Sequence, residues 1–275
     1  SLFNYYLFMT FISVFTTMTN PDERNDPWQE ALDCYNKISD NNVVTVGEDW
    51  PLEFDWGIFN KVYQRGFDKC DSKWVMRMDL DYFIHEDDIE KIKFYLKKYN
   101  DEPGIVLPQY QFFTHDRYQI KTKLCLLLNK ERFPDIKLNG GTDKMLATLD
   151  GKLLTYNNVP QIRVPIWQYD SMFRTKEIIK NDRARFARAW FRTFNHYGDR
   201  GGDKPDEAFD AWFLMIQERY KKHVFKMDID KHPVFIKNKL KKVSSDQFGY
   251  DAFGLKNNTK FEYFNLFSEL KKKYF

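Results

Sequence analysis

The segment Lys73–Phe83, KWVMRMDLDYF, decides the fold of this chain of 275 residues. Large apolar side chains occupy alternate positions from Trp74 to Met78, which predicts a buried β-strand. The strand pattern ends in the sequence DLD, where Asp79 and Asp81 stand two residues apart. Residues i and i+2 of an extended chain point to the same side, so both carboxylates are expected to face one ligand at the end of a strand.

Two units of strand and helix precede this segment. Apolar, β-branched runs over Phe11–Met18 and Asn42–Val46 predict strands, and helical spacing predicts helices from Asp26 onward and over Trp56–Phe67. Asp26 stands before Pro27, so it is expected to cap the first helix. Strands that alternate with helices of about ten to fifteen residues indicate βαβ units on a mainly parallel sheet.

The rest of the chain continues with helices and fewer strands. A strand is expected over Gly104–Phe113, a single further element over Tyr118–Asn129, and a turn-rich excursion over Leu138–Lys152. Helices are expected over Glu86–Tyr99, Lys176–Phe194, Glu207–Tyr220 and Lys260–Tyr274. We therefore expect a Rossmann-like half over residues 1–115 and a second half with C-terminal helices over residues 116–275, the two forming one continuous domain.

Composition excludes several classes of protein. Basic residues number 43 and acidic residues 40, a net charge of +3 that is too even for a general nucleic-acid binder. The content of 18% aromatic residues predicts a large core. Three cysteines far apart fit buried thiols better than a disulfide framework or a zinc site. The run Leu2–Met18 is short and interrupted by polar residues, so a cytoplasmic protein without a membrane span is expected.

The paired aspartates suit a divalent cation. Carboxylate oxygens are the ligands that Mg²⁺ and Mn²⁺ prefer, and diphosphate oxygens complete their coordination shells. Two adjacent buried carboxylates without a cation raise one another's pKa. The alternative is a solvated acidic turn, since Glu86 to Asp88 follow closely. The chain has no phosphate-binding GxxxxGK[ST] loop, no GxGxxG after the first strand, no GxSxG and no HExxH.

These features together resemble the nucleotide-sugar-dependent glycosyltransferases of the GT-A fold, most closely the inverting, family 2-like enzymes. The resemblance covers about the first 115 residues and rests on FTTMTNPDER, DLD and the basic residue of YQRGF, although the family's fuller ARNxG pattern reads QRGFD here. It implies a GT-A (Rossmann-like) mixed, mainly parallel sheet flanked by helices, with a helical C-terminal region. It also implies a nucleotide-sugar-binding first half and an acceptor-binding second half.

The resemblance further implies roles for individual residues. Asp81 would bind Mn²⁺ or Mg²⁺, Asp79 would bind the ribose or a metal-bound water, and His232 would add a metal ligand unless it is a surface histidine. The residues expected to contact the nucleotide are Thr16, Thr17, Arg24, Glu48, Asp49 and Arg65. The base that deprotonates the acceptor is expected first at Asp170, which alternatively caps a helix, and then at Asp143 or Glu207.

Other side chains have two readings. The aromatic residues Tyr110, Phe112, Trp167 and Tyr169 could stack on sugars but fit core positions better. The basic residues Lys121, Lys123, Arg183 and Arg185 fit solvated faces better than diphosphate contacts.

The resemblance thus implies a metal-dependent glycosyltransferase. It would move a sugar from a nucleoside diphosphate, UDP first and GDP second, to a hydroxyl of a glycan or other acceptor, with inversion. The alternatives are a nucleotidyltransferase and a non-catalytic carbohydrate-binding domain derived from a transferase.

Overall fold

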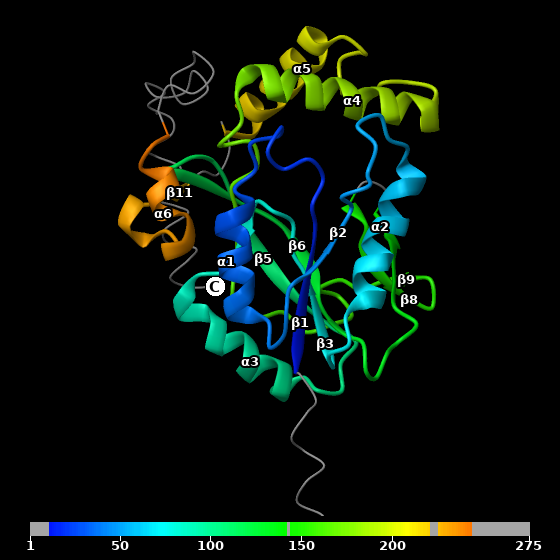
Figure 1. The fold of residues 1–275 in the computed structure, drawn as a ribbon, viewed down its shortest axis with the longest axis vertical. Coiled ribbons are helices and arrows are strands. Elements are labelled where there is room, and N and C mark those ends of the chain that lie inside the picture. The colour runs from blue at the N-terminus through cyan, green and yellow to red at the C-terminus, as the bar shows by residue number, and fades with distance from the viewer. Residues whose placement is uncertain (1–10, 142–143, 221–224, 244–275) are drawn as a thin grey trace, which may run out of the picture.

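The computed structural model describes residues 11–141, 144–220 and 225–243. The strands of the main sheet are β1 (Ile12–Thr17), β2 (Val44–Val46), β3 (Trp74–Arg77), β4 (Tyr82–Phe83), β5 (Gly104–Thr114), β6 (Arg117–Asn129), β10 (Ile166–Gln168) and β11 (Phe225–Lys226). In the described part of the chain they follow the order β2-β1-β3-β6-β5-β10-β4, with β11 paired to β6 (Figure 1). The helices are α1 (Trp28–Ile38), α2 (Trp56–Lys69), α3 (Ile89–Lys98), α4 (Lys176–Phe194), α5 (Pro205–Tyr220) and α6 (Val234–Leu240).

The first three strands and two helices form the expected βαβ units. Strand β1 lies between β2 and β3 and is parallel to both. Its alternate side chains enter different cores: Ile12 and Val14 pack with α1, whereas Phe15 packs with α2. Gly66 allows this close approach of α2, because a Cβ at that position would lie 2.3 Å from the Phe15 ring. The two helices therefore cover opposite faces of the sheet.

The sheet is mixed, and its α/β class with flanking helices agrees with the expectation. Beyond β1, β2 and β3, parallel pairing recurs between β5 and β10. Strand β6 is antiparallel to both β3 and β5, because only His115 and Asp116 separate β5 from β6 and a connection that short forms a hairpin. As a result β6, from the second half of the chain, lies between β3 and β5 of the first half.

Two expected segments differ in the structure. The segment Lys73–Phe83 is not one strand, since a turn separates β3 from β4. The excursion Leu138–Lys152 is not only a loop, because it contributes to a small antiparallel sheet of β7 (Lys137–Gly140), β8 (Leu146–Leu149) and β9 (Lys152–Leu153). The helix expected over Lys260–Tyr274 lies outside the described residues.

Buried side chains agree with the composition. All three cysteines are buried and free. Phe112, Trp167 and Tyr169 are core residues, and Tyr110 is partly buried and packs against them, as expected. Within the described residues, no helix has the length and apolar character needed to cross a membrane.

Helices α4 and α5 pack together and lie across the end of the sheet toward which β1 runs (Figure 1). The Thr175 hydroxyl caps α4 by accepting from the Ile178 N–H at 3.2 Å. Ion pairs join α4 to the loop before α2: Arg188 contacts Glu53, and Arg192 Nε lies 2.9 Å from Asp55 Oδ1. These contacts place one face of α4 above the ends of the parallel strands.

Candidate active site

A cleft of about 360 Å³ opens at the carboxyl ends of β1 and β3, and α4 contributes one wall. Strands β2 and β3 lie on opposite sides of β1, and doubly wound sheets bind ligands where the strand order reverses in this way. The charged side chains that line the cleft are Arg24, Asp26, Arg77, Asp79, Asp81, Lys121, Lys144, Asp170, Arg174, Asp182, Arg183 and Arg185.

Asp79 and Asp81 both line this cleft, but not from an extended strand. Strand β3 ends at Arg77, and the Tyr82 N–H donates to the Asp79 carbonyl at 2.8 Å to close a tight turn. The prediction that both carboxylates share one side of an extended chain is therefore wrong. The turn between β3 and β4 brings them to the cleft instead.

Asp79 is held by two neighbours. The Tyr63 hydroxyl donates to Asp79 Oδ1 at 3.0 Å, and Arg77 Nη2 lies 3.3 Å from Asp79 Oδ2. Arg77 is buried and also donates to the carbonyls of Lys144 and Met145 at 2.6 and 2.7 Å. The Asp79 carboxylate therefore has a fixed position and a neutralising partner.

Asp81 is a more weakly partnered carboxylate. Its Oδ2 accepts from Gln168 Nε2 at 3.3 Å, and the described residues offer it no ion pair. Burial, together with the charges of Asp170 and Asp79, raises the pKa of Asp81 to about 7. The environment of Asp81 thus disfavours its negative charge, which a bound cation would stabilise.

Asp170 lies next to Asp81, but its surroundings favour the charged form of the carboxyl group. Gln111 Nε2 and the Ser171 hydroxyl each donate to its carboxylate at 3.0 Å. Burial acts to raise the pKa of Asp170, but the charges of Arg183, Lys121 and Arg174 outweigh it and hold the pKa below its usual range. Asp170 is therefore ionised at neutral pH and oriented toward the cleft.

The raised pKa of Asp81 predicts a pH-dependent stability difference. Between about pH 4 and pH 7 the folded protein keeps a proton on Asp81 that the unfolded chain releases. Folding stability from this group is therefore present below pH 4 and is lost as the pH rises toward 7. Asp81→Asn removes this dependence. The unfolding free energy of the variant is therefore expected to exceed that of the parent by a difference that reaches about a few kcal/mol near neutral pH.

Urea unfolding of both proteins at pH 5, 6, 7 and 8 without divalent cations measures this difference. The gap in unfolding free energy should widen from pH 5 to pH 7 and then level off. A constant gap across this range would show that Asp81 titrates normally.

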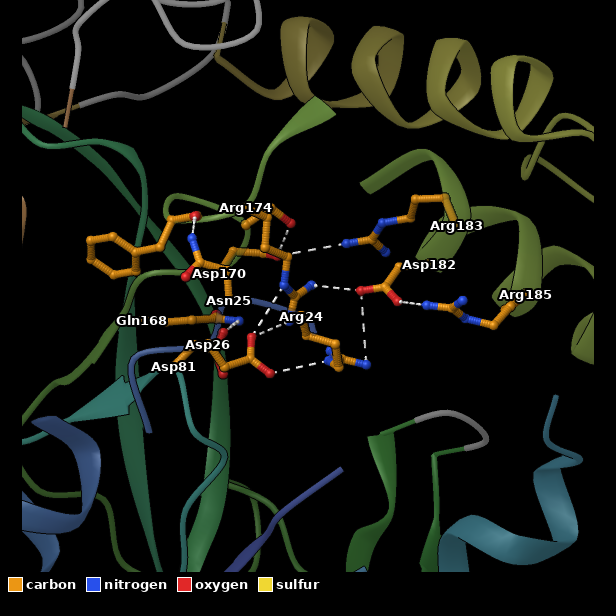
Figure 2. Close-up of polar contacts among 12 residues, drawn as sticks. Arg24, Asn25, Asp26, Asp81, Gln168, Asp170, Arg174, Asp182, Arg183 and Arg185 are labelled. Carbon is orange, nitrogen blue, oxygen red and sulfur yellow. Dashed lines mark hydrogen bonds and ion pairs between the residues drawn. The ribbon is translucent and has the colours of Figure 1, made fainter. Parts of the chain in front are cut away.

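Three arginines and two aspartates form a partly buried cluster at the wall of the cleft (Figure 2). Asp26 accepts from Arg174 Nη2 at 2.6 Å and from Arg24 Nε at 3.1 Å. Asp182 pairs with Arg185 at 2.5 Å and with Arg174 at 3.5 Å. The cluster joins the loop before α1 to the start of α4, across 148 residues of sequence.

The prediction that Asp26 caps α1 is wrong. Pro27 occupies the cap position, and no side chain caps the helix. The Asp26 carboxylate turns instead to Arg24 and Arg174, because charge-assisted hydrogen bonds with two guanidinium groups outweigh one bond to a backbone N–H.

The expected nucleotide contacts from the end of β1 lie at or beside the cleft. Thr17 and Arg24 line it, although the Arg24 side chain is engaged with Asp26 and Asp182. Thr16 is fully buried behind this surface, and its hydroxyl has no hydrogen-bond partner among the described residues.

The contacts expected after β2 lie elsewhere. Arg65 Nη2 pairs with Asp49 Oδ1 at 2.7 Å on the exposed surface, and neither residue lines the cleft. Glu48 is also exposed and lies outside the lining. The same loop reaches the cleft through the apolar side chains of Trp50 and Leu52. The structure therefore does not bring Glu48, Asp49 or Arg65 to the cleft.

Of the three candidate bases, only Asp170 lies in the cleft among the described residues. Asp143 falls outside those residues. Glu207 is exposed on α5, 3.8 Å from Lys204, and does not line the cleft.

His232 is neither a surface histidine nor positioned as a metal ligand. It is fully buried, with the Tyr169 hydroxyl 2.8 Å from its Nδ1 and the His115 carbonyl 2.7 Å from its Nε2. Burial lowers its pKa to about 4, so the ring is neutral at physiological pH. Both ring nitrogens are occupied by protein groups, and this histidine stabilises the core.

The sequence interpretation missed much of the cleft floor and its basic wall. Lys121, Arg183 and Arg185 line the cleft and are not on solvated faces, whereas Lys123 contacts Gln161 on the surface as expected. The side chains missed entirely include Gln109, Gln111, Gln168 and Arg174. The alternation of glutamines at positions 109 and 111, on a strand of otherwise apolar character, was the available signal.

The residues at Asp81 fit a divalent cation in part. A buried carboxylate with a raised pKa suits a cation, and Asp79 lies beside it with Arg77 already in place. Within the described residues, no three histidine, cysteine or carboxylate groups gather to hold a metal by themselves. An ion here would therefore depend on oxygens from a ligand and from water, as Mg²⁺ sites with one or two carboxylates do.

Comparison with known proteins adds little to these observations. Neither a protein-family model nor a curated protein sequence matches the chain. Among solved structures, S. aureus TarS 1-349 is similar over 76% of this chain and 73% of that chain, with 12% identity and a TM-score of 0.37. A similarity of this size assigns neither a family nor an activity, so the chemistry of the cleft must be inferred from its own residues.

Proposed function

We propose that the protein is a metal-dependent glycosyltransferase that transfers a sugar from a nucleoside diphosphate to a hydroxyl group, with inversion. The observation that carries this proposal is the grouping of Asp79, Asp81 and Asp170 with basic side chains in one cleft at the reversal of strand order. These side chains could bind the cation and the diphosphate and could supply the base toward the acceptor.

The donor side of the site would be centred on Asp81. Asp81, with Asp79 beside it, would hold Mn²⁺ or Mg²⁺ together with diphosphate oxygens. When bound, such an ion supplies positive charge that stabilises the departing nucleoside diphosphate. Arg24 and Arg174 lie on the same wall and add to the positive potential.

The nucleoside would lie against the apolar side of the cleft. Trp50, Phe54, Phe59 and Phe186 line this side, and Trp50 and Phe59 pack edge to face at 4.5 Å between ring centroids. A flat aromatic surface suits a nucleobase or a sugar face. UDP is the first choice of nucleotide and GDP the second.

Asp170 would act as the base toward the acceptor. It is ionised, and Gln111 and Ser171 fix its orientation. An acceptor hydroxyl within hydrogen-bond reach of Asp170 could transfer its proton as the oxygen attacks the sugar carbon on the face opposite the diphosphate. The acceptor oxygen and the departing diphosphate would then lie on opposite sides of the sugar carbon.

Calorimetric titration of the full chain with UDP and GDP, with and without Mn²⁺, tests the donor site. We expect one nucleotide to bind in the presence of Mn²⁺ and to lose at least about tenfold in affinity without it, because the cation bridges two sets of negative charge. A panel of UDP- and GDP-sugars then tests for sugar release. Absence of nucleotide binding would indicate a non-catalytic domain, and release of pyrophosphate from a nucleoside triphosphate would indicate a nucleotidyltransferase.

A further inference from the structure

The cleft contains a second group of polar side chains, centred on Asp170, which lies next to Asp81. Gln109 on β5 and Lys121 on β6 are direct cross-strand partners, and both line the cleft. Side chains at such paired positions lie on the same face of the sheet. Arg183 reaches the same region from α4, opposite the sheet.

Gln109 and Lys121 both present donors without acceptors. Gln109 is 2% exposed, and its Nε2 has no hydrogen-bond partner among the described residues. Lys121 is partly buried and forms neither a hydrogen bond nor an ion pair within the part of the chain that the structure describes. A buried donor without a partner is costly, so such groups commonly mark a place where a ligand binds.

Arg183 differs from the other arginines of the cleft. Arg24, Arg174 and Arg185 each form close ion pairs with Asp26 or Asp182. Arg183 Nη2 lies 3.6 Å from Asp170 Oδ1, beyond hydrogen-bond distance, and its guanidinium stands 5.5 Å from the centre of the Trp212 ring. Figure 2 shows the Arg183 side chain extending from α4 toward Asp170. Its five N–H donors find no hydrogen-bond acceptor among the described side chains.

Lys121 and Arg183 place two positive charges beside Asp170, and the raised pKa of the neighbouring Asp81 favours the neutral form of that carboxyl group. One carboxylate, which already accepts from Gln111 and Ser171, faces the two cations Lys121 and Arg183. Burial lowers the pKa of the Lys121 ammonium, which an additional anion beside it would reverse. An oxyanion with several acceptor oxygens would satisfy all three donors at once.

We propose that Lys121, Arg183 and Gln109 form an oxyanion subsite that binds a phosphate or carboxylate group carried by the acceptor, beside Asp170. This inference rests on the proposed function and specifies its acceptor as an anionic molecule. The subsite serves the acceptor because Asp170 is the principal charged neighbour of both Lys121 and Arg183. Asp81 is a further charged neighbour of Lys121, whereas neither Asp79 nor Asp81 is among the main charged neighbours of Arg183.

Glycerol 1-phosphate and glycerol are suitable probes, because they differ only by the phosphate group. Titration into the full chain, saturated with Mn²⁺ and UDP, should show binding of glycerol 1-phosphate and none of glycerol at equal concentration. Arg183→Gln should lower the affinity for glycerol 1-phosphate by about tenfold or more, since it removes a charge-assisted contact. Arg163→Gln, at an exposed arginine outside the cleft, should leave that affinity unchanged.

The same variants separate this inference from the proposed function. Arg183→Gln should keep its affinity for UDP with Mn²⁺; an equal loss of UDP and of glycerol 1-phosphate would place the cations on the donor diphosphate and overturn the acceptor subsite. Equal binding of glycerol 1-phosphate and glycerol would also overturn it. So would a loss of affinity for glycerol 1-phosphate in Arg163→Gln that equals the loss in Arg183→Gln. Failure of the parent protein to bind UDP with Mn²⁺, while Arg183-dependent phosphate binding persists, would refute the proposed function alone. If Arg183→Gln does not fold, Lys121→Gln carries the same test.

Discussion

Asp81→Asn is expected to lower the release of nucleoside diphosphate from the best sugar donor by at least about 100-fold. The substitution keeps the shape of the side chain but removes the negative charge that would hold the cation. Stabilisation of a leaving group by a metal amounts to several kcal/mol, and each 1.4 kcal/mol changes the rate about tenfold. Initial rates of UDP or GDP release at saturating Mn²⁺ measure the effect.

Unfolding does not explain such a loss, because removing a buried carboxylate with a raised pKa should leave the protein at least as stable near neutral pH. Asp87→Asn provides the matched control, since Asp87 lies six residues further on and its side chain is 82% exposed. Its rate should stay within about twofold of the parent. Full, Mn²⁺-dependent turnover by a folded Asp81→Asn protein would refute the assignment of Asp81.

Asp26→Asn is expected to reduce the free energy of unfolding by about 3–5 kcal/mol, because it removes the closest counter-ion of Arg174 and leaves that arginine only Asp182 at 3.5 Å. Asp26 receives three hydrogen bonds, two from Arg174 and one from Arg24. The Arg174 side chain is 10% exposed, so water compensates little for the lost partner. Urea unfolding at pH 7 measures the change.

The size of this loss of stability shows whether Asp26 acts through its ion pairs or as a helix cap. Loss of a cap costs about 1 kcal/mol, so a change of that size would favour the cap that the sequence suggested. Asp33→Asn, on the exposed side of α1, serves as the control and should change stability by less than about 0.5 kcal/mol. If Asp26→Asn does not fold, the double variant Asp26→Leu with Arg174→Met should recover part of the stability, because it removes both charges.

Much of the scaffold could be predicted because its signals are local. The apolar runs around β1, β2 and β3, and the helical spacing over α1, α2 and α4, gave the element order and the α/β class. The sequence pattern predicts an element at β6 but not its type, and it predicts neither β10 nor α6, since short elements and long amphipathic strands carry weak periodic signals. Five of the expected site residues line the cleft: Asp79 and Asp81, which follow from the end of a strand pattern, and Thr17, Arg24 and Asp170, which come from the resemblance.

The differences between the expected and the observed positions of these side chains share one cause. Glu48, Asp49 and Arg65 stand at the positions that the resemblance indicates, but Arg65 and Asp49 pair with each other on the surface. Lys121 and Arg183 looked like solvated charges, because their distance from Asp170 depends on how β6 and α4 pack. A charge pattern along one element does not tell which side chain of another element will face it.

The sequence by itself determined the order of the first strands and helices, through β3, and placed two aspartates next to the end of a central strand, because hydrophobic periodicity acts over a few neighbouring residues. The tertiary structure alone decided the chemistry of those groups. It brought Asp170 beside Asp81, joined Asp26 to Arg174 across 148 residues, and raised the pKa of Asp81 to about 7. Burial and the distance between charges set these properties, and both arise only when segments far apart in the chain pack together.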